Sequence, residues 1–155
     1  MKIAVAIAAE NALPSAFVVF RGIEQSIRKA ALLGYDGIEL ALLDKDQVDL
    51  NKVKSLICEY KLEIPVISTG QVFAGSKLWF THPDPGIRSR AISVFKGMIE
   101  TAANFGAMVN IGRVRGFIED GEEPEVAEDR FVEVIREISL YAQKYEVTLI
   151  LEPVN

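Results

Sequence analysis

Two glutamates end apolar segments, where a carboxylate is costly to bury unless it has a partner or a role in a site. Glu152 closes the apolar run Val147–Glu152 and precedes Pro153, and Glu39 lies near the end of the run Gly37–Leu42. Carboxylates placed in this way can transfer protons or bind a divalent cation. Two plainer interpretations stay open: Glu152 as a solvated strand-end carboxylate, and Glu39 as one half of a structural ion pair.

Six further residues with chemical potential fall in predicted loops after apolar runs. The glycines, one followed by a glutamine, either let the backbone approach a ligand closely or serve ordinary turns. The two arginines of the segment GRVRG either grip a phosphate or acidic sugar bidentately or are solvated. The histidine of the Thr-His-Pro-Asp segment either contacts substrate or belongs to the turn. The six residues are Gly70, Gln71, His82, Gly112, Arg113 and Arg115.

Five short apolar runs predict the strands that must position these residues. Each run is rich in Val, Ile or Leu without clear polar alternation, which is typical of parallel strands covered on both faces. The runs are Lys2–Ala8, Gly37–Leu42, Ile64–Thr69, Ala107–Ile111 and Val147–Glu152. Residues 1–155 are therefore expected to form one α/β domain around a parallel sheet.

The segments between the runs predict four helices. Apolar residues recur there at three- and four-residue spacing, which is typical of amphipathic helices. Asp84 followed by Pro85 is expected to be an N-cap with proline in the first turn, and Asp49 is a second candidate cap. Gly34 and Gly106 suit the left-handed position that follows a helix. Cys58 is expected to pack against the core.

The connections that leave the strands are long, whereas those that enter them are short. The long connections cover residues 9–15, 70–84 and 112–124. Functional residues of parallel α/β proteins gather at the carboxyl ends of the strands, which is where these residues lie. Two closures of the sheet fit the pattern: a flavodoxin-like doubly wound sheet of five strands, and the (βα)4β half of a TIM barrel. A doubly wound fold normally covers its last strand with a helix, so the ending at Glu152 favours the half barrel.

Composition argues against several classes of partner. A net charge of −5 disfavours nucleic acid or an anionic membrane surface as the main partner. A single cysteine cannot form an internal disulfide, and no stretch reaches the roughly 20 apolar residues of a membrane span. These features predict a cytoplasmic protein.

Several motifs, in order along the chain, resemble the sugar phosphate isomerase/epimerase superfamily. They are GYDGIEL, STGQVF, THPDPGIRSRAI, FGAMVNIGRVRG and LILEPVN. The superfamily consists of xylose isomerase-like TIM barrels and includes the D-tagatose 3-epimerase group. The resemblance spans this whole chain but only the N-terminal half of such an enzyme.

The resemblance implies a metal-dependent enzyme of carbohydrate metabolism. The Glu-Pro-Val-Asn segment implies that Glu152 is a metal ligand and a catalytic acid–base group for proton transfer beside the carbonyl of a ketose or sugar phosphate. The implied cofactor is Mn²⁺, Co²⁺ or Mg²⁺. The remaining ligands of the family lie on strands six to eight, so the site is expected to be incomplete, and the chain inactive, in isolation.

Two other functions stay open. A half barrel could be a non-catalytic binding or assembly module, because open edges at the first and fifth strands invite pairing with another chain or a second copy. An endonuclease IV-like enzyme also shares the superfamily, but it needs several histidines and a basic face. One histidine and an acidic balance argue against that alternative.

Overall fold

The computed structural model describes residues 1–13 and 18–153. Part of the predicted loop 9–15 and the final residues Val154 and Asn155 lie outside the described residues. Within the described ranges, no helix is both long enough and apolar enough to span a membrane.

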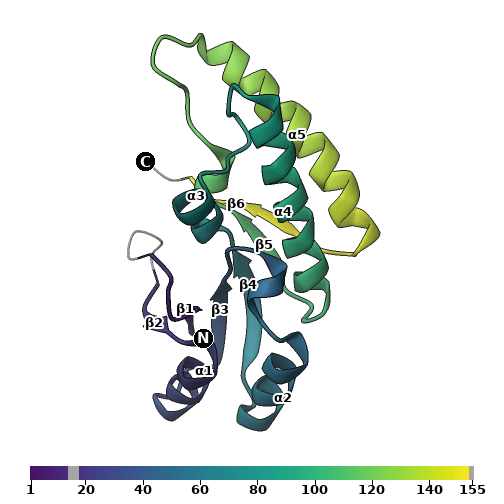
Figure 1. Ribbon diagram of the computed structural model, residues 1–155. Helices are drawn as coiled ribbons and strands as arrows, with labels where there is room; N and C mark the ends of the chain where they lie inside the picture. The colour runs from purple at the N-terminus through teal and green to yellow at the C-terminus, as the bar shows by residue number, and fades with distance from the viewer. Residues whose placement is uncertain (14–17, 154–155) are drawn as a thin grey trace.

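A six-stranded parallel sheet forms the centre of the fold (Figure 1). Its spatial order is β2-β1-β3-β4-β5-β6, so the five predicted strands follow one another in chain order. A doubly wound sheet reverses its strand order at a switch point, with helix-connected strands on both sides of it. Here the five predicted strands show no such reversal, and only the two-residue β2 lies on the other side of β1. The prediction of a parallel half barrel is therefore confirmed. The strands are β1 (Ala4–Ala8), β2 (Phe20–Arg21), β3 (Gly37–Ala41), β4 (Glu63–Ser68), β5 (Met108–Ile111) and β6 (Leu149–Leu151).

The four predicted helices alternate with these strands, and their ends follow the predicted signals. Asp84 caps α4 by accepting a hydrogen bond from the backbone N–H of Gly86 at 2.7 Å, and Pro85 opens the helix. Asp49 caps α2 in the same way. Gly34 and Gly106 have φ angles of 80° and 63°, the left-handed region predicted for them. The four helices are α1 (Ile23–Leu32), α2 (Leu50–Tyr60), α4 (Pro85–Ala103) and α5 (Pro124–Lys144).

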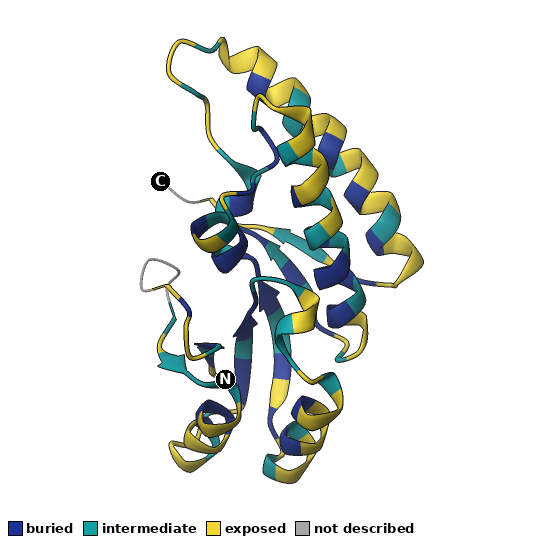
Figure 2. Ribbon diagram, viewed as in Figure 1, coloured by how far each residue is buried: buried dark blue, intermediate teal, exposed yellow. Residues whose placement is uncertain are grey.

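The two faces of the sheet differ in burial (Figure 2). One face carries a cross-strand row that is completely buried, consisting of Ile7, Leu40, Ile67 and Val109. The row on the other face is only half-buried, and it consists of Ala6, Glu39, Val66 and Met108. Because side chains alternate along a strand, residues two apart in each strand share this open face.

The structure contains one strand, one helix and two 3₁₀ turns that the sequence analysis did not predict. Strand β2 pairs in parallel with the end of β1, so the outer edge of the first strand is not fully open as expected. Helix α3 (Gly70–Ser76) lies inside the predicted loop 70–84. The two 3₁₀ turns are η2 (Lys45–Gln47) and η3 (Arg113–Arg115). The prediction for Cys58 was wrong, because its side chain is exposed.

Candidate functional site

Glu152 lies directly after β6 and is fixed at three points. Its backbone N–H donates to the carbonyl oxygen of Ile111 at 3.2 Å, which extends the pairing between β5 and β6 by one residue. The Asn110 amide donates to Glu152 Oε2 at 2.8 Å. An Arg115 guanidinium N–H donates to the backbone oxygen of Glu152 at 3.3 Å. The residue is exposed, so its second carboxylate oxygen lies where a ligand could reach it.

Glu39 lies on the same open face of the sheet, three strands away. Its row neighbours are Ala6 and Val66, both half-buried. Burial raises the pKa of the Glu39 carboxyl, a hydrogen bond from Ser68 lowers it, and the negative charge of Glu152 raises it again. The charge of Glu152 therefore acts on Glu39. The two predicted carboxylates therefore lie on one face of the sheet, Glu39 in the middle of β3 and Glu152 directly after β6.

Gly112 leaves the space in which the Glu152 carboxylate lies. A Cβ atom at this position would be 3.2 Å from Glu152 Oε2 and 3.7 Å from Asn110 Nδ2. A contact of 3.2 Å is tighter than nine in ten contacts of real Cβ atoms, so with a side chain at Gly112 the carboxylate would have to shift by a few tenths of an ångström. Close approach of a ligand to the Gly112 backbone stays a prediction.

Asn110 belongs to this site, and the sequence analysis missed it. It lies on β5, paired with Ser68 on one side and Ile150 on the other, and all three share the open face. Its position inside a short apolar strand was the available signal, since asparagine is uncommon in strands. An asparagine two residues before Gly112, on the same face of the strand, could have suggested a polar strand end.

Gly70 and Gln71 form the first turn of α3, not the predicted loop. Gln71 is only 3% exposed, and its Nε2 atom has no hydrogen-bond partner among the described residues. Thr69, the residue before the helix, donates its hydroxyl to the backbone oxygen of Asn110 at 2.7 Å. The two predicted residues therefore lie at the carboxyl end of β4, next to the strand that carries Asn110.

Arg113 and Arg115 both lie in η3, directly after β5. Arg115 contacts the backbone of Glu152, as described above. The Arg113 guanidinium lies 6.0 Å from the centre of the Phe73 ring in α3, a cation–π distance. Both arginines thus adjoin the strand ends, and both make contacts within the chain.

His82 takes part in the turn before α4. Its Nδ1 atom accepts a hydrogen bond from the backbone N–H of Asp84 at 2.9 Å. Its ring lies 4.4 Å from the Trp79 ring, which in turn stacks on Phe117 at 5.2 Å. These contacts give His82 a role in the turn. Its ring packs with Trp79 and Phe117, and a contact with substrate stays a prediction.

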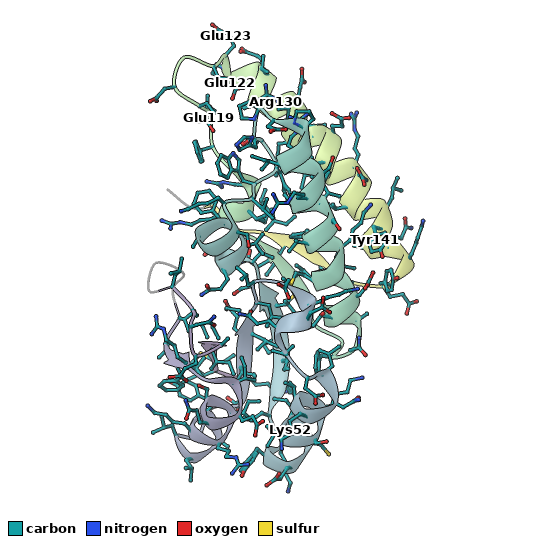
Figure 3. The ribbon with its side chains drawn as sticks, viewed as in Figure 1. Lys52, Glu119, Glu122, Glu123, Arg130 and Tyr141 are labelled. Atoms are coloured by element: carbon teal, nitrogen blue, oxygen red, sulfur yellow. The ribbon has the colours of Figure 1, made fainter. Side chains whose placement is uncertain are left out.

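The loop after β5 is fastened to the loop before α4. Phe80 donates its backbone N–H to the oxygen of Val114 at 2.9 Å, and Thr81 donates its hydroxyl to the oxygen of Phe117 at 2.8 Å. An Arg130 guanidinium N–H donates to the backbone oxygen of Thr81 at 3.1 Å. Arg130 also pairs with Glu122, and Figure 3 shows these two side chains close together near the start of α5. Two loops that leave neighbouring strands therefore form one joined rim.

The site has the oxygen donors that hard divalent cations prefer, but too few of them. Glu39 and Glu152 supply carboxylates on one face, and Asn110 supplies an amide. Across residues 1–13 and 18–153, no three His, Cys, Asp or Glu side chains gather closely enough to hold a metal ion. The residues present fit a part of a metal site.

Comparisons with known proteins agree with the fold. A family model described as xylose isomerase-like TIM barrel matches residues 27–155. No protein of curated function matches the chain. The solved D-allulose 3-epimerase of Methylomonas sp., in complex with D-allulose, is similar over all of this chain and 55% of its own, with 22% identity and a TM-score of 0.73.

Two further structures show the same partial coverage. An L-ribulose 3-epimerase has 20% identity and a TM-score of 0.73, over 99% of this chain and 50% of its own. The 3-keto-D-glucoside 4-epimerase of E. coli has 17% identity and a TM-score of 0.72, over 99% of this chain and 57% of its own. This chain therefore spans about half the length of these solved relatives.

Proposed function

Because the chain belongs to the xylose isomerase-like TIM barrel family, we propose that it forms the N-terminal (βα)4β5 portion of a metal-dependent sugar isomerase or epimerase. The complete barrel would act on a ketose or sugar phosphate by moving a proton on the carbon next to the carbonyl. The three solved relatives described above are epimerases of sugars or of a keto-glucoside, which supports this class of substrate.

The placement of Glu152 is the observation that carries the proposal. Its carboxylate lies at the carboxyl end of the parallel sheet, where active sites of (β/α)8 barrels are built. Asn110 and Gly112, both from the end of β5, hold it and make room for it. A solvated strand-end carboxylate would need neither the donor nor the bare glycine. Glu39 adds a second carboxylate, whose pKa is raised by burial and by the charge of Glu152.

Within this proposal Glu152 would hold a divalent ion together with groups from the remaining strands. The ion would polarise the carbonyl oxygen of the sugar and so lower the cost of removing the neighbouring proton. Glu152 would take or return that proton, because a carboxylate held by one donor keeps a second oxygen for proton transfer. Three further residues would contact the hydroxyl groups or phosphate of the substrate: Glu39 of β3, Gln71 of α3 and Arg115 of η3.

Calorimetric titration with Mn²⁺, Co²⁺ or Mg²⁺ tests this function. The separate chain is expected to bind weakly or not at all, because its oxygen donors are too few. The complete barrel, extended through strand eight, is expected to bind, and its Glu152→Gln variant is expected to lose at least tenfold in affinity, about 1.4 kcal/mol. The proposal would be wrong if the complete barrel bound no divalent ion and exchanged no proton of a ketose in D₂O.

A non-catalytic assembly module is the second candidate, and the edges of the sheet favour it. Among residues 1–13 and 18–153, strand β6 pairs only with β5, and β2 pairs only with the last two residues of β1. Both ends of the sheet therefore present backbone groups that another strand could pair with. In this alternative the complete assembly would bind no substrate, and the same calorimetric experiment separates it from the enzyme.

A further inference from the structure

The Asn110 amide is oriented by Glu152 and not by its own surroundings. Its Nδ2 atom donates to Glu152 Oε2 at 2.8 Å, whereas its Oδ1 atom is buried and has no partner among the described residues. Turning the amide over would place Oδ1 against a carboxylate oxygen and leave the carboxylate without a donor. The side chain thus leaves its own carbonyl oxygen unsatisfied, a costly arrangement, in order to hold the glutamate.

The backbone of Asn110 is held in place by hydrogen bonds and by strand pairing on both sides. The Thr69 hydroxyl donates to the Asn110 oxygen at 2.7 Å, and Thr69 is only 1% exposed. Asn110 also pairs with Ser68 of β4 and Ile150 of β6, so strands flank it on both sides. The side-chain amide therefore projects from a backbone that is hydrogen-bonded and flanked by two strands, two residues before Gly112.

A neutral donor suits this position better than the alternatives. Aspartate would have nearly the same shape but would place a negative charge directly against the Glu152 carboxylate. Leucine would fill the same space but could not donate a hydrogen bond. The amide orients the carboxylate and, being uncharged, leaves the negative charge of Glu152 available to a cation.

We propose that Asn110 is a positioning residue that fixes the direction of the Glu152 carboxylate before any metal ion or substrate binds. The purpose of that alignment rests on the function proposed above, but the hydrogen bond itself does not. A carboxylate already aimed in the separate chain would lose less conformational freedom when the remaining ligands meet it.

Amide hydrogen exchange of the ¹⁵N-labelled chain, without metal or substrate, tests this role. Asn110→Leu and Asn110→Asp should speed exchange of the Glu152 amide about three- to tenfold, the effect of losing one hydrogen bond. The Val109 amide, which donates to Thr148 at 3.0 Å, should keep its rate in both variants, because the rest of the β5–β6 pairing is intact. In the unaltered chain, one Asn110 side-chain proton should exchange slowly.

Asn104, the C-cap residue of α4, offers a control away from the strand ends. Its exposed amide donates to the Glu100 oxygen at 2.8 Å, so Asn104→Leu and Asn104→Asp remove a similar bond away from the site. These variants should leave the Glu152 rate unchanged. Unchanged Glu152 exchange in Asn110→Leu would overturn the proposal by showing that Asn110 only fills space. Equal acceleration at Val109 would overturn it by showing general loosening of β6. The exchange experiment uses no metal or substrate, so its outcome does not depend on whether the proposed isomerase or epimerase activity is correct.

Discussion

The Glu39 carboxyl is placed where its charge is unfavourable for stability. Burial raises its pKa above the ordinary 4.5, and the negative charge of Glu152 raises it further, against the lowering effect of the Ser68 hydrogen bond. A folded protein with such a group holds its proton more tightly than the unfolded chain does. The contribution of Glu39 to the free energy of unfolding should therefore fall as the pH rises from about 4.5 through the folded pKa of this carboxyl, and then level off.

Replacing Glu39 with glutamine should make the chain more stable at neutral pH. The amide keeps an oxygen that can accept from Ser68 but carries no charge to desolvate or to repel Glu152. The advantage in free energy of unfolding over the unaltered chain should be small near pH 4 and should grow toward pH 7. The reason is that the Glu39 carboxyl loses its proton in that window, whereas the glutamine amide does not titrate. Urea unfolding at several pH values measures it.

An exposed glutamate on α2 provides the control for this measurement. Glu59→Gln removes the same charge from a solvated helix surface, so its effect should be small at every pH. A Glu39→Gln variant that was no more stable at pH 7 than at pH 4 would contradict the prediction. A confirmed gain would show that a destabilising carboxylate is kept at the strand end, which is typical of functional sites.

The residues of the site were predictable only where their type was out of place in the sequence. Glu39 and Glu152 stand out as charges at the ends of apolar runs, and Gly112 stands out as a glycine after a strand. Asn110 was missed because its importance comes from Glu152, forty-two positions away. Its contact depends on the β5–β6 register, which no local pattern contains. The roles of these residues in binding stay predictions.

At the scale of elements, long periodic segments were predicted correctly and short ones were not. Four amphipathic helices and five apolar strands carry a pattern over several residues. Strand β2 has only two residues, too few for any periodicity. Helix α3 has seven residues and contains glycines at its first and sixth positions, so its propensity is low. It forms because Val72 and Ala74 are buried against the rest of the fold, a tertiary effect.

The joint between the two rim loops depends on Gly116. Its φ of 92° and ψ of −162° belong to a region open almost only to glycine. A Cβ atom there would lie 2.2 Å from Thr81 Oγ1 and 2.6 Å from Trp79 Cδ1. Alanine would therefore separate the loop after β5 from the loop before α4. Gly116→Ala should lower the free energy of unfolding by about 2–4 kcal/mol, from backbone strain and overpacking together.

Gly121 separates these two causes. Its φ is 80°, but a Cβ atom there would meet nothing within 4 Å. Gly121→Ala should therefore cost only the backbone term, about 1–2 kcal/mol. Urea unfolding gives both values, and fluorescence of Trp79, the only tryptophan, should change in Gly116→Ala alone. Equal losses in the two variants would show that the loops are not held together at Gly116.

The whole molecule is a sheet with one covered face and one half-open face. The helices bury the row that includes Leu40 and Val109, while Glu39 and Met108 remain half-buried on the opposite side. A closed barrel would bury the open face around its axis and would pair both edges. The surfaces that closure of a barrel would bury are therefore the ones left half-open in the separate chain.

The free edge of β6 should make the separate chain associate with itself. Thr148 accepts from Val109, and Glu152 donates to Ile111, so alternate residues of β6 face β5. By the parallel-ladder pattern the backbone groups of Leu149 and Leu151 then point to the open edge. Light scattering should show a mass that rises above 17.1 kDa with concentration.

Leu151→Pro should abolish this association without loosening β6. Proline removes an edge-facing N–H that β5 does not use, and edge strands tolerate it. Leu151→Ala is the matched control: it removes the apolar side chain, which is 57% exposed, but keeps the N–H. If the backbone edge drives association, alanine should still associate and proline should not. A compact monomer of the unaltered chain at every concentration would contradict this prediction. It would show that the open edges are protected, because an unprotected edge strand pairs with another chain as the concentration rises.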